Sequence, residues 1–209
     1  VGTQQGLAVL DPLKQKVTYP LPVAFGTEGT GNIRSLLIDR NGNIWAGAWG
    51  GLWFIGGNAK HFSIILPHPE LPSNDAANSV TGILRDNTGR FWIGTDNGGL
   101  TEQGVGMAKF IAFPTIMALA DDQKGRIWTA PWGDGIIISD GTTKLKHIKN
   151  PFPEKIISDN VVRCFAQVTD SMMAIGTESG FDLYNTRRDA LIPPPAWSAG
   201  ISEQRVNAF

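Results

Sequence analysis

The stretch that decides the fold reads Asp86-Asn87-Thr88-Gly89-Arg90-Phe91-Trp92-Ile93-Gly94-Thr95, followed after three intervening residues by Gly99-Leu100. Asp86 and Gly89 predict a turn, because an aspartate side chain can bond its own backbone and glycine supplies a positive φ. The apolar run after the turn predicts a strand. In it Trp92 buries a large area, while Gly94 lets a neighbouring sheet approach closely.

The same pattern recurs along the chain. A close copy runs from Ile33 through Asp39 and Trp45 to Gly51-Leu52, and a third copy starts at Ile116. A fourth, weaker copy starts at Val161 and has Ala174 where the others have tryptophan. The starts at positions 33, 80, 116, 161 and 206 are 47, 36, 45 and 45 residues apart. This period is the length of one blade of a β-propeller.

Each copy predicts four strands, for which the first copy gives residues 33–38, 44–47, 51–55 and 61–65. The opening strand is almost continuously apolar, which predicts an innermost strand packed on both faces between neighbouring blades. Four strands make one blade, and blades that bury their faces against each other form a ring around a channel. We therefore expect an all-β propeller with no long helix, as a single domain over residues 1–209.

The two ends of the chain predict complementary parts of one blade. Residues 1–32 supply its second, third and fourth strands, and residues 206–209 supply a first strand. Pairing between them would close a ring of about five blades. Equally, the chain could be an arc of a larger propeller, and its opening in the middle of a repeat suggests a longer parent.

The repeat, with its apolar start, Asp-x-x-Gly turn, aromatic-Trp-x-Gly-Thr strand and Gly-Leu, resembles the two-component regulator propeller repeat. Residues 86–100 match best, and residues 39–52 follow closely. The resemblance implies the periplasmic sensor region of a bacterial hybrid histidine kinase or related signalling protein, which recognises a ligand, often a glycan fragment. No kinase, transmembrane or DNA-binding segment is present in these 209 residues, so the resemblance assigns to them the recognition part alone.

Composition and motifs exclude several other classes of function. The net charge is −1 and the 18 Lys and Arg residues are scattered, so we expect no nucleic-acid partner. We expect Cys164 to be a small buried hydrophobe. His61, His68 and His147 lack metal-ligand spacing, and no nucleophile elbow or phosphate-binding loop occurs, so we expect no metal, no cofactor and no catalytic residue. We assign Asp39, Asp86 and Asp122 to turn chemistry.

Candidate ligand-binding residues lie where the repeat is fixed but the residue varies. These positions are the loops between the second and third strands and the connections that enter each inner strand, which share one face of the ring. Indoles among amides and carboxylates suit stacking on a sugar and bonding its hydroxyls. The predicted residues are Trp49, Trp132, Asp96, Asn97, Asp134, Asn78 and Asn160.

Alternatives remain open at this level. Trp49 and Trp132 could each fold over its own blade as a lid on the core. A streptogramin-lyase-like propeller enzyme would need a catalytic histidine near the mouth of the channel, where none of the three histidines is expected. A protein-interaction scaffold would bind a folded partner instead of a small molecule or oligosaccharide. Self-association through propeller edges or faces is a further expectation.

Overall fold

The computed structural model describes residues 1–4, 6–18, 32–57, 62–103, 115–151, 153–193 and 204–208. Within these ranges the chain is all-β apart from one short 3₁₀ helix, η2 (Ala76–Asn78). The expectation of an all-β chain without a long helix is therefore confirmed. No helix in the same ranges is long and apolar enough to cross a membrane.

Four antiparallel sheets follow one another along the chain, each with its strands in sequence order. The first has β5 (Ile33–Ile38), β6 (Ile44–Ala48), β7 (Gly51–Ile55) and β8 (Phe62–Ile65). The second has β9 (Val80–Arg85), β10 (Phe91–Thr95) and β11 (Leu100–Glu102). The third has β12 (Ile116–Asp121), β13 (Ile127–Pro131), β14 (Ile136–Ser139) and β15 (Lys144–Ile148). The fourth has β16 (Val162–Thr169), β17 (Met172–Thr177), β18 (Gly180–Asn185) and β19 (Ala190–Ile192).

These sheets are the predicted blades, and we call them blades 1 to 4. The segment expected to form the outer strand of blade 2 falls in residues 104–114, outside the described residues. The N-terminal part forms two small strand pairs, as expected for a partial repeat. They are β1 (Gly2–Thr3) with β2 (Gly6–Leu7), and β3 (Val9–Asp11) with β4 (Lys16–Thr18).

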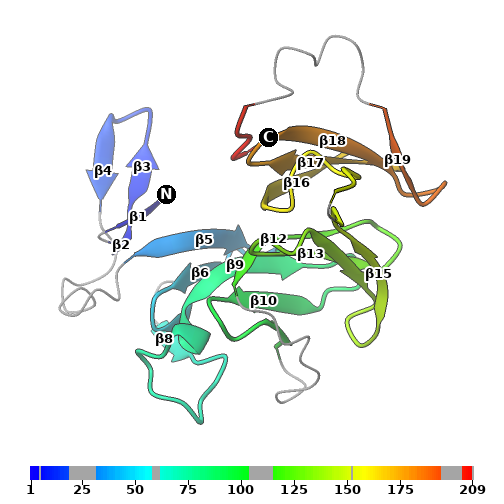
Figure 1. Ribbon diagram of the computed structural model, residues 1–209. Helices are drawn as coiled ribbons and strands as arrows, with labels where there is room; N and C mark the ends of the chain where they lie inside the picture. Colours follow the sequence, from blue (N-terminus) through cyan, green and yellow to red (C-terminus); the bar gives the residue numbers. More distant parts are fainter. Residues whose placement is uncertain are drawn as a thin grey trace.

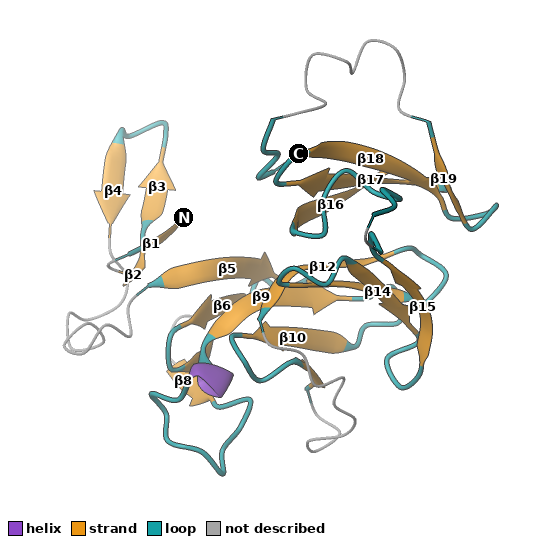
Figure 2. Cartoon of the chain, in the orientation of Figure 1, coloured by secondary structure: helices purple, strands orange, loops and turns teal. Residues whose placement is uncertain are grey.

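The blades are arranged around an arc, with the N-terminal strands beyond blade 1 and the C-terminus beside blade 4 (Figures 1 and 2). Successive inner strands β5, β9, β12 and β16 contact one another, which is the expected packing of propeller blades. Among the described residues, no backbone hydrogen bond joins residues 1–4 to residues 204–208. The structure thus fits an arc of a propeller, and closure of a five-bladed ring stays a prediction.

A repeated contact sets the distance between neighbouring blades. In β1 and in the second strands of blades 1, 2 and 4, a glycine faces an apolar residue of the segment that follows in the next repeat, so closely that there is no room for a side chain. A methyl group added at Gly94, for example, would lie 2.8 Å from Cγ2 of Ile116. The contacts of this kind are Gly2 with Ile33, Gly47 with Val80, Gly94 with Ile116 and Gly176 with Val206.

The aspartate of the first turn connects that turn to the core of its blade. Oδ1 of Asp86 accepts from the backbone N–H groups of Thr88 and Arg90, and Oδ2 accepts from Nε1 of Trp92 at 2.9 Å. The side chain of Trp92 is 1% exposed. Asp39 with Trp45 and Asp122 with Trp128 repeat this arrangement. The turn role expected of these aspartates is confirmed, with the indole as an additional partner.

Three details differ from the sequence-based expectations. The strand of blade 4 begins at Val162, one residue later than the expected repeat start. The inner strand β5 is not packed on both faces, because Leu36 and Ile38 are exposed. Among the described residues, β5 has a neighbouring inner strand, β9, on one side only, which explains this exposure. Cys164 is half-buried instead of fully buried.

Candidate functional site

The two ends of the sheets present different surfaces. We call loop face the end that holds the connections between second and third strands, at residues 49–50, 96–99, 132–135 and 178–179. We call turn face the opposite end, where each inner strand turns into the second strand at residues 39–43, 86–90 and 122–126. The residues predicted to bind a ligand belong to the loop face and to the connections that enter it.

Of the two predicted tryptophans, Trp132 is the more exposed. It follows β13 directly, and its backbone N–H donates to the carbonyl oxygen of Thr115 at 2.8 Å, which fixes the start of the loop. The side chain is 51% exposed. The guanidinium carbon of Arg163 lies 5.0 Å from the centre of the indole, within the range of a cation–π interaction.

Arg163 is itself held by a chain of charges. Its Nε donates to Oε1 of Glu178 at 2.6 Å, and Glu178 also pairs with Arg205. The hydrogen bond from Arg163, together with that from Arg205, lowers the pKa of the Glu178 carboxyl. Because Arg163 lies on β16 and Glu178 follows β17, blade 4 holds the cation that stacks on the indole of blade 3. Trp132, Arg163, Glu178 and Arg205 together form what we call the indole platform.

The other predicted loop residues lie on the same face, and all of them except Asn97 are partly buried or paired. Trp49 is half-buried in the loop after β6. Asp96 accepts from the hydroxyl of Thr115 at 2.6 Å and lies 3.8 Å from Arg34. Asn97 is exposed and has a φ of 69°, a left-handed conformation that asparagine tolerates well. Asp134 pairs with Lys149 at 2.6 Å.

Asn78 and Asn160 both make structural hydrogen bonds. Oδ1 of Asn78 accepts from the backbone N–H of His68, and its Nδ2 donates to the carbonyl oxygens of His68 and Pro72. The residue is fully buried, so no part of this side chain is exposed to a ligand. Asn160 makes the equivalent reciprocal bonds with Asn150, also ten residues earlier. Both side chains clamp the connection that enters an inner strand.

Two of the histidines lie in the described residues, away from the inner strands. His68 is buried in the connection before η2, with Nδ1 3.0 Å from Oε1 of Glu70. His147 lies on the outer strand β15 and contacts the carbonyl oxygen of Asp134 at 2.7 Å. His61 lies outside the described residues.

The predicted ligand-binding residues do not include Arg163, Glu178 or Arg205, although Glu178 and Arg205 lie in the loops and connections that form the candidate face. Arg163 interrupts an apolar strand, which is a weak signal, because a single charge on an inner strand could equally face the channel. Its pairing with Glu178 depends on the register of β16 and β17, in which Val162 lies opposite Thr177. That register could not be predicted from the sequence, because blade 4 lacks the turn glycine and the tryptophan that set the register in the other blades.

Comparison with known proteins supports the fold. The chain has 15% identity and a TM-score of 0.68 to PorZ, a surface component of the type-IX secretion system of Porphyromonas gingivalis, covering 98% of this chain and 33% of PorZ. For the WD40 β-propeller domain of Doa1 the values are 13% and 0.58, covering 78% and 54%. At such identities the likeness shows the fold alone.

A third similar structure is the extracellular domain of a one-component system protein, BT4673, from B. thetaiotaomicron. It has 14% identity and a TM-score of 0.49, covering 91% of this chain and 35% of that domain. This chain thus spans about a third of the length of that domain and of PorZ. Among curated protein sequences, none matches the chain significantly.

The family comparison addresses the repeat directly. The profile described as two component regulator propeller matches residues 27–50 and residues 74–97. Each match covers the inner strand of a blade, its Asp-x-x-Gly turn and its tryptophan strand, which are the residues that suggested the resemblance. The chain therefore carries repeats of the two-component regulator propeller family, set in a propeller fold.

Proposed function

We propose that this chain is a non-enzymatic ligand-recognition propeller, the extracytoplasmic sensing part of a bacterial two-component signalling protein. Its ligand would be a small molecule or oligosaccharide bound on the loop face. The repeat family supports a sensor role, since such repeats occur in the sensor regions of signalling proteins. The same resemblance supports a periplasmic location and a role without catalysis, and both are part of this proposal.

The observation that carries the proposal is the exposed indole of Trp132. Covering a half-exposed aromatic ring removes apolar surface from water, which is favourable. Sugars stack on such rings while their hydroxyls form hydrogen bonds with nearby polar groups. Arg163 fixes the indole from one side, and Glu178 fixes Arg163. A platform held in this way costs little side-chain entropy when a ligand binds.

The alternative that Trp132 is a lid on its own blade has less support. The cation that stacks on it comes from blade 4, and half of its surface is exposed. Trp49, which is half-buried, fits the lid interpretation better. Glycan recognition by the chain therefore rests on Trp132 more than on Trp49.

A glycan array probed with the wild-type chain and with Trp132→Ala tests this proposal. We expect the wild type to retain one class of oligosaccharide and Trp132→Ala to lose it, since truncation of a stacking aromatic commonly costs more than 1 kcal/mol of binding. Leu145→Ala is the matched control, because Leu145 is 53% exposed on β15 of the same blade.

Three results would count against the proposal. Binding that survives Trp132→Ala would exclude the indole platform as the site. Affinity for a folded protein together with indifference to sugars would favour a scaffold. Turnover of a small substrate that is abolished by replacement of a histidine would favour a lyase-like enzyme.

A further inference from the structure

The turn face contains a cavity of about 600 Å³. Three consecutive blades contribute charged residues to its wall, each from the end of an inner strand or the turn that follows. Arg40 comes from the turn after β5, Arg85 ends β9 and Asp121 ends β12. The cavity lies at the opposite end of the sheets from the indole platform and shares no residue with it. An inference about the cavity is therefore independent of the function proposed above.

The two arginines bring positive charge that the protein does not neutralise. Among the described residues, Arg40 and Arg85 have neither an ion pair nor a hydrogen bond from their guanidinium groups. Nε of Arg85 is buried and without a partner, which is costly for a charged donor. Its guanidinium carbon lies 5.7 Å from the centre of the Phe91 ring, which helps to hold the side chain in place.

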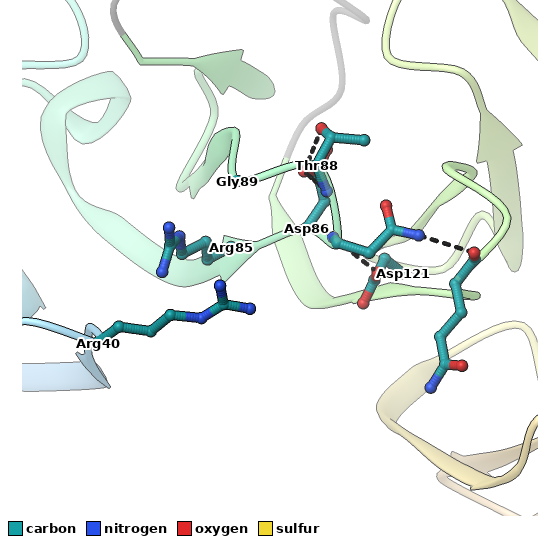
Figure 3. A pocket seen from close by; sticks show the side chains of 8 residues that line it. Arg40, Arg85, Asp86, Thr88, Gly89 and Asp121 are labelled. Carbon is teal, nitrogen blue, oxygen red and sulfur yellow. Dashed lines mark hydrogen bonds between the residues drawn. The ribbon is translucent and has the colours of Figure 1, made fainter.

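The aspartates at the cavity are not counter-ions to these arginines. Oδ2 of Asp86 accepts from Nε of Arg90 at 2.7 Å and from Trp92, and Oδ1 accepts from Thr88, so its charge is used within its own turn. Oδ2 of Asp121 accepts from the backbone N–H of Asn87 at 3.2 Å. In Figure 3 the arginine side chains lie on one side of the turn that carries Asp86, and Asp121 lies on the other.

The cavity is therefore cationic on one side and hydrogen-bond accepting on the other. Guanidinium groups match the planar geometry of a carboxylate and can donate two parallel hydrogen bonds to it. The carboxylate of Asp121 can accept only, so a ligand group near it must be a donor such as a hydroxyl. Burial raises the pKa of Asp121, which fits a carboxylate with few partners of its own.

We propose that this cavity binds a small hydroxylated carboxylate, such as a sugar acid. Its carboxylate lies between Arg40 and Arg85, and its hydroxyls donate to Asp121. The chain then has a second recognition site, on the face opposite the indole platform.

Isothermal titration with D-glucuronate, D-glucose and inorganic sulfate tests the proposal on the whole chain. We expect glucuronate to bind more tightly than either glucose, which lacks the carboxylate, or sulfate, which lacks the hydroxyls. Arg40→Gln and Arg85→Gln should each weaken glucuronate binding roughly tenfold or more, because each removes charged hydrogen bonds of about 1.5–3 kcal/mol. Asp121→Asn should reduce the advantage of glucuronate over sulfate.

Matched variants separate this site from general effects of charge or folding. Arg187→Gln removes an exposed arginine in the turn between β18 and β19 and should leave the affinity unchanged. Arg85→Lys keeps the positive charge at this position. The melting temperature of each variant checks that loss of binding is not caused by loss of the fold. Glucuronate binding that is lost in Trp132→Ala and kept in Arg40→Gln would assign the sugar acid to the loop face and contradict this site.

Two outcomes would overturn the proposal. Equal affinity for glucose and glucuronate, or affinity that survives Arg40→Gln with Arg85→Gln, would show that the arginines do not bind a carboxylate. Binding of sulfate as tight as that of glucuronate would show an unspecific anion site without the hydroxyl contact.

Discussion

Nε1 of Trp92 donates a hydrogen bond to Oδ2 of Asp86, six residues earlier, so that the first turn of blade 2 and its core are one unit. Blades 1 and 3 repeat the bond, at 3.1 and 3.3 Å. In blade 4 both partners are missing together, since Ala174 occupies the tryptophan position and Val168 lies six residues before it. Each partner is thus present only where the other one is.

Asp86→Asn should destabilise the chain by about 2–4 kcal/mol. The amide nitrogen of the new side chain would replace Oδ2, which accepts from both Trp92 and Arg90. The N–H groups of these two residues would then face another donor and lose their acceptor. Asp170→Asn is the matched control, because Asp170 is exposed in the turn of blade 4 and should change stability by less than about 0.5 kcal/mol. Urea unfolding of the two variants measures the difference, and equal losses would contradict the role of the Asp86 bonds.

Acid should destabilise the fold between about pH 4 and pH 2. Burial alone raises the pKa of Asp86, but hydrogen bonds from Thr88, Trp92 and Arg90 outweigh it and hold the pKa at about 2. The folded-state pKa lies below the unfolded value of 3.8, so the stabilisation is complete above the unfolded pKa and is lost as the pH falls through the folded one. For Asp86 it amounts to about 2 kcal/mol.

Other aspartates modify this pH dependence. Asp39 and Asp189 also have pKa values of about 2 and add to the loss in acid, whereas the raised pKa of Asp121 works in the opposite direction. Urea midpoints at pH 7, 4, 3 and 2 should therefore fall steeply below pH 4 for the wild type and less steeply for Asp86→Asn. A parallel fall in both proteins would exclude Asp86 as a main contributor.

Gly94→Ala should cost about 1–3 kcal/mol through overpacking at the contact between blades 2 and 3. The added methyl group would meet Cγ2 of Ile116 at 2.8 Å and its Cβ at 3.0 Å, on a strand that cannot move without shifting the next blade. Ala130 is the natural alanine at the equivalent place in blade 3, so Ala130→Gly serves as the control and should cost only about 0.5–1 kcal/mol. Thermal melting compares the two variants, and an unchanged melting temperature for Gly94→Ala would contradict the tight contact.

The parts of the fold that could be predicted from the sequence are those fixed by neighbouring residues. The turn from Asp86 to Gly89 and the strand with Trp92 are local, and they recur at a regular period, which is why the blades were found. The register of blade 4 depends on weaker signals, and there the predicted start of the inner strand, Val161, is one residue before the observed start of β16.

The site could be predicted only in part, because it depends on contacts between distant residues. Trp132 was found, since its loop position follows from the repeat. Its partner Arg163 belongs to the next blade, and Arg40, Arg85 and Asp121 come from three different blades. Asn78 was expected on the surface because it precedes an inner strand, but its partner His68 lies ten residues earlier, and no local pattern shows that pairing.

Asn78→Ala should lower stability by several kcal/mol without any ligand present. It removes three hydrogen bonds of 2.8 to 3.0 Å from a fully buried site, among them the one that the backbone N–H of His68 donates. Asn32→Ala, at an exposed position before the inner strand of blade 1, is the control and should be nearly neutral. A ligand-binding role without a structural one would give the opposite pattern, with normal melting of Asn78→Ala and lost binding.

The C-terminal segment should protect the single cysteine of the chain. The backbone N–H of Val206 donates to the carbonyl oxygen of Thr177 at 2.9 Å, and the thiol of Cys164 lies 3.5 Å from the carbonyl oxygen of Val206. Burial raises the pKa of this thiol, which further slows its reaction. Removal of residues 204–209 should therefore make Cys164 react several-fold faster with a thiol reagent and lower the melting temperature. Cys164→Ser, which should give no signal, identifies the reacting group.

The same truncation tests whether the ring closes. If residues 206–209 pair with the strand at Gly2–Thr3 as predicted, the intact chain has no open inner edge and should be a monodisperse monomer. Truncation would then expose an unpaired strand edge, and such edges recruit other chains. Light scattering should show association only after truncation, with faster reaction of Cys164 in the same sample. Association before and after truncation would contradict closure and favour the arc, while the thiol result would still report on the contact between Val206 and Cys164 alone.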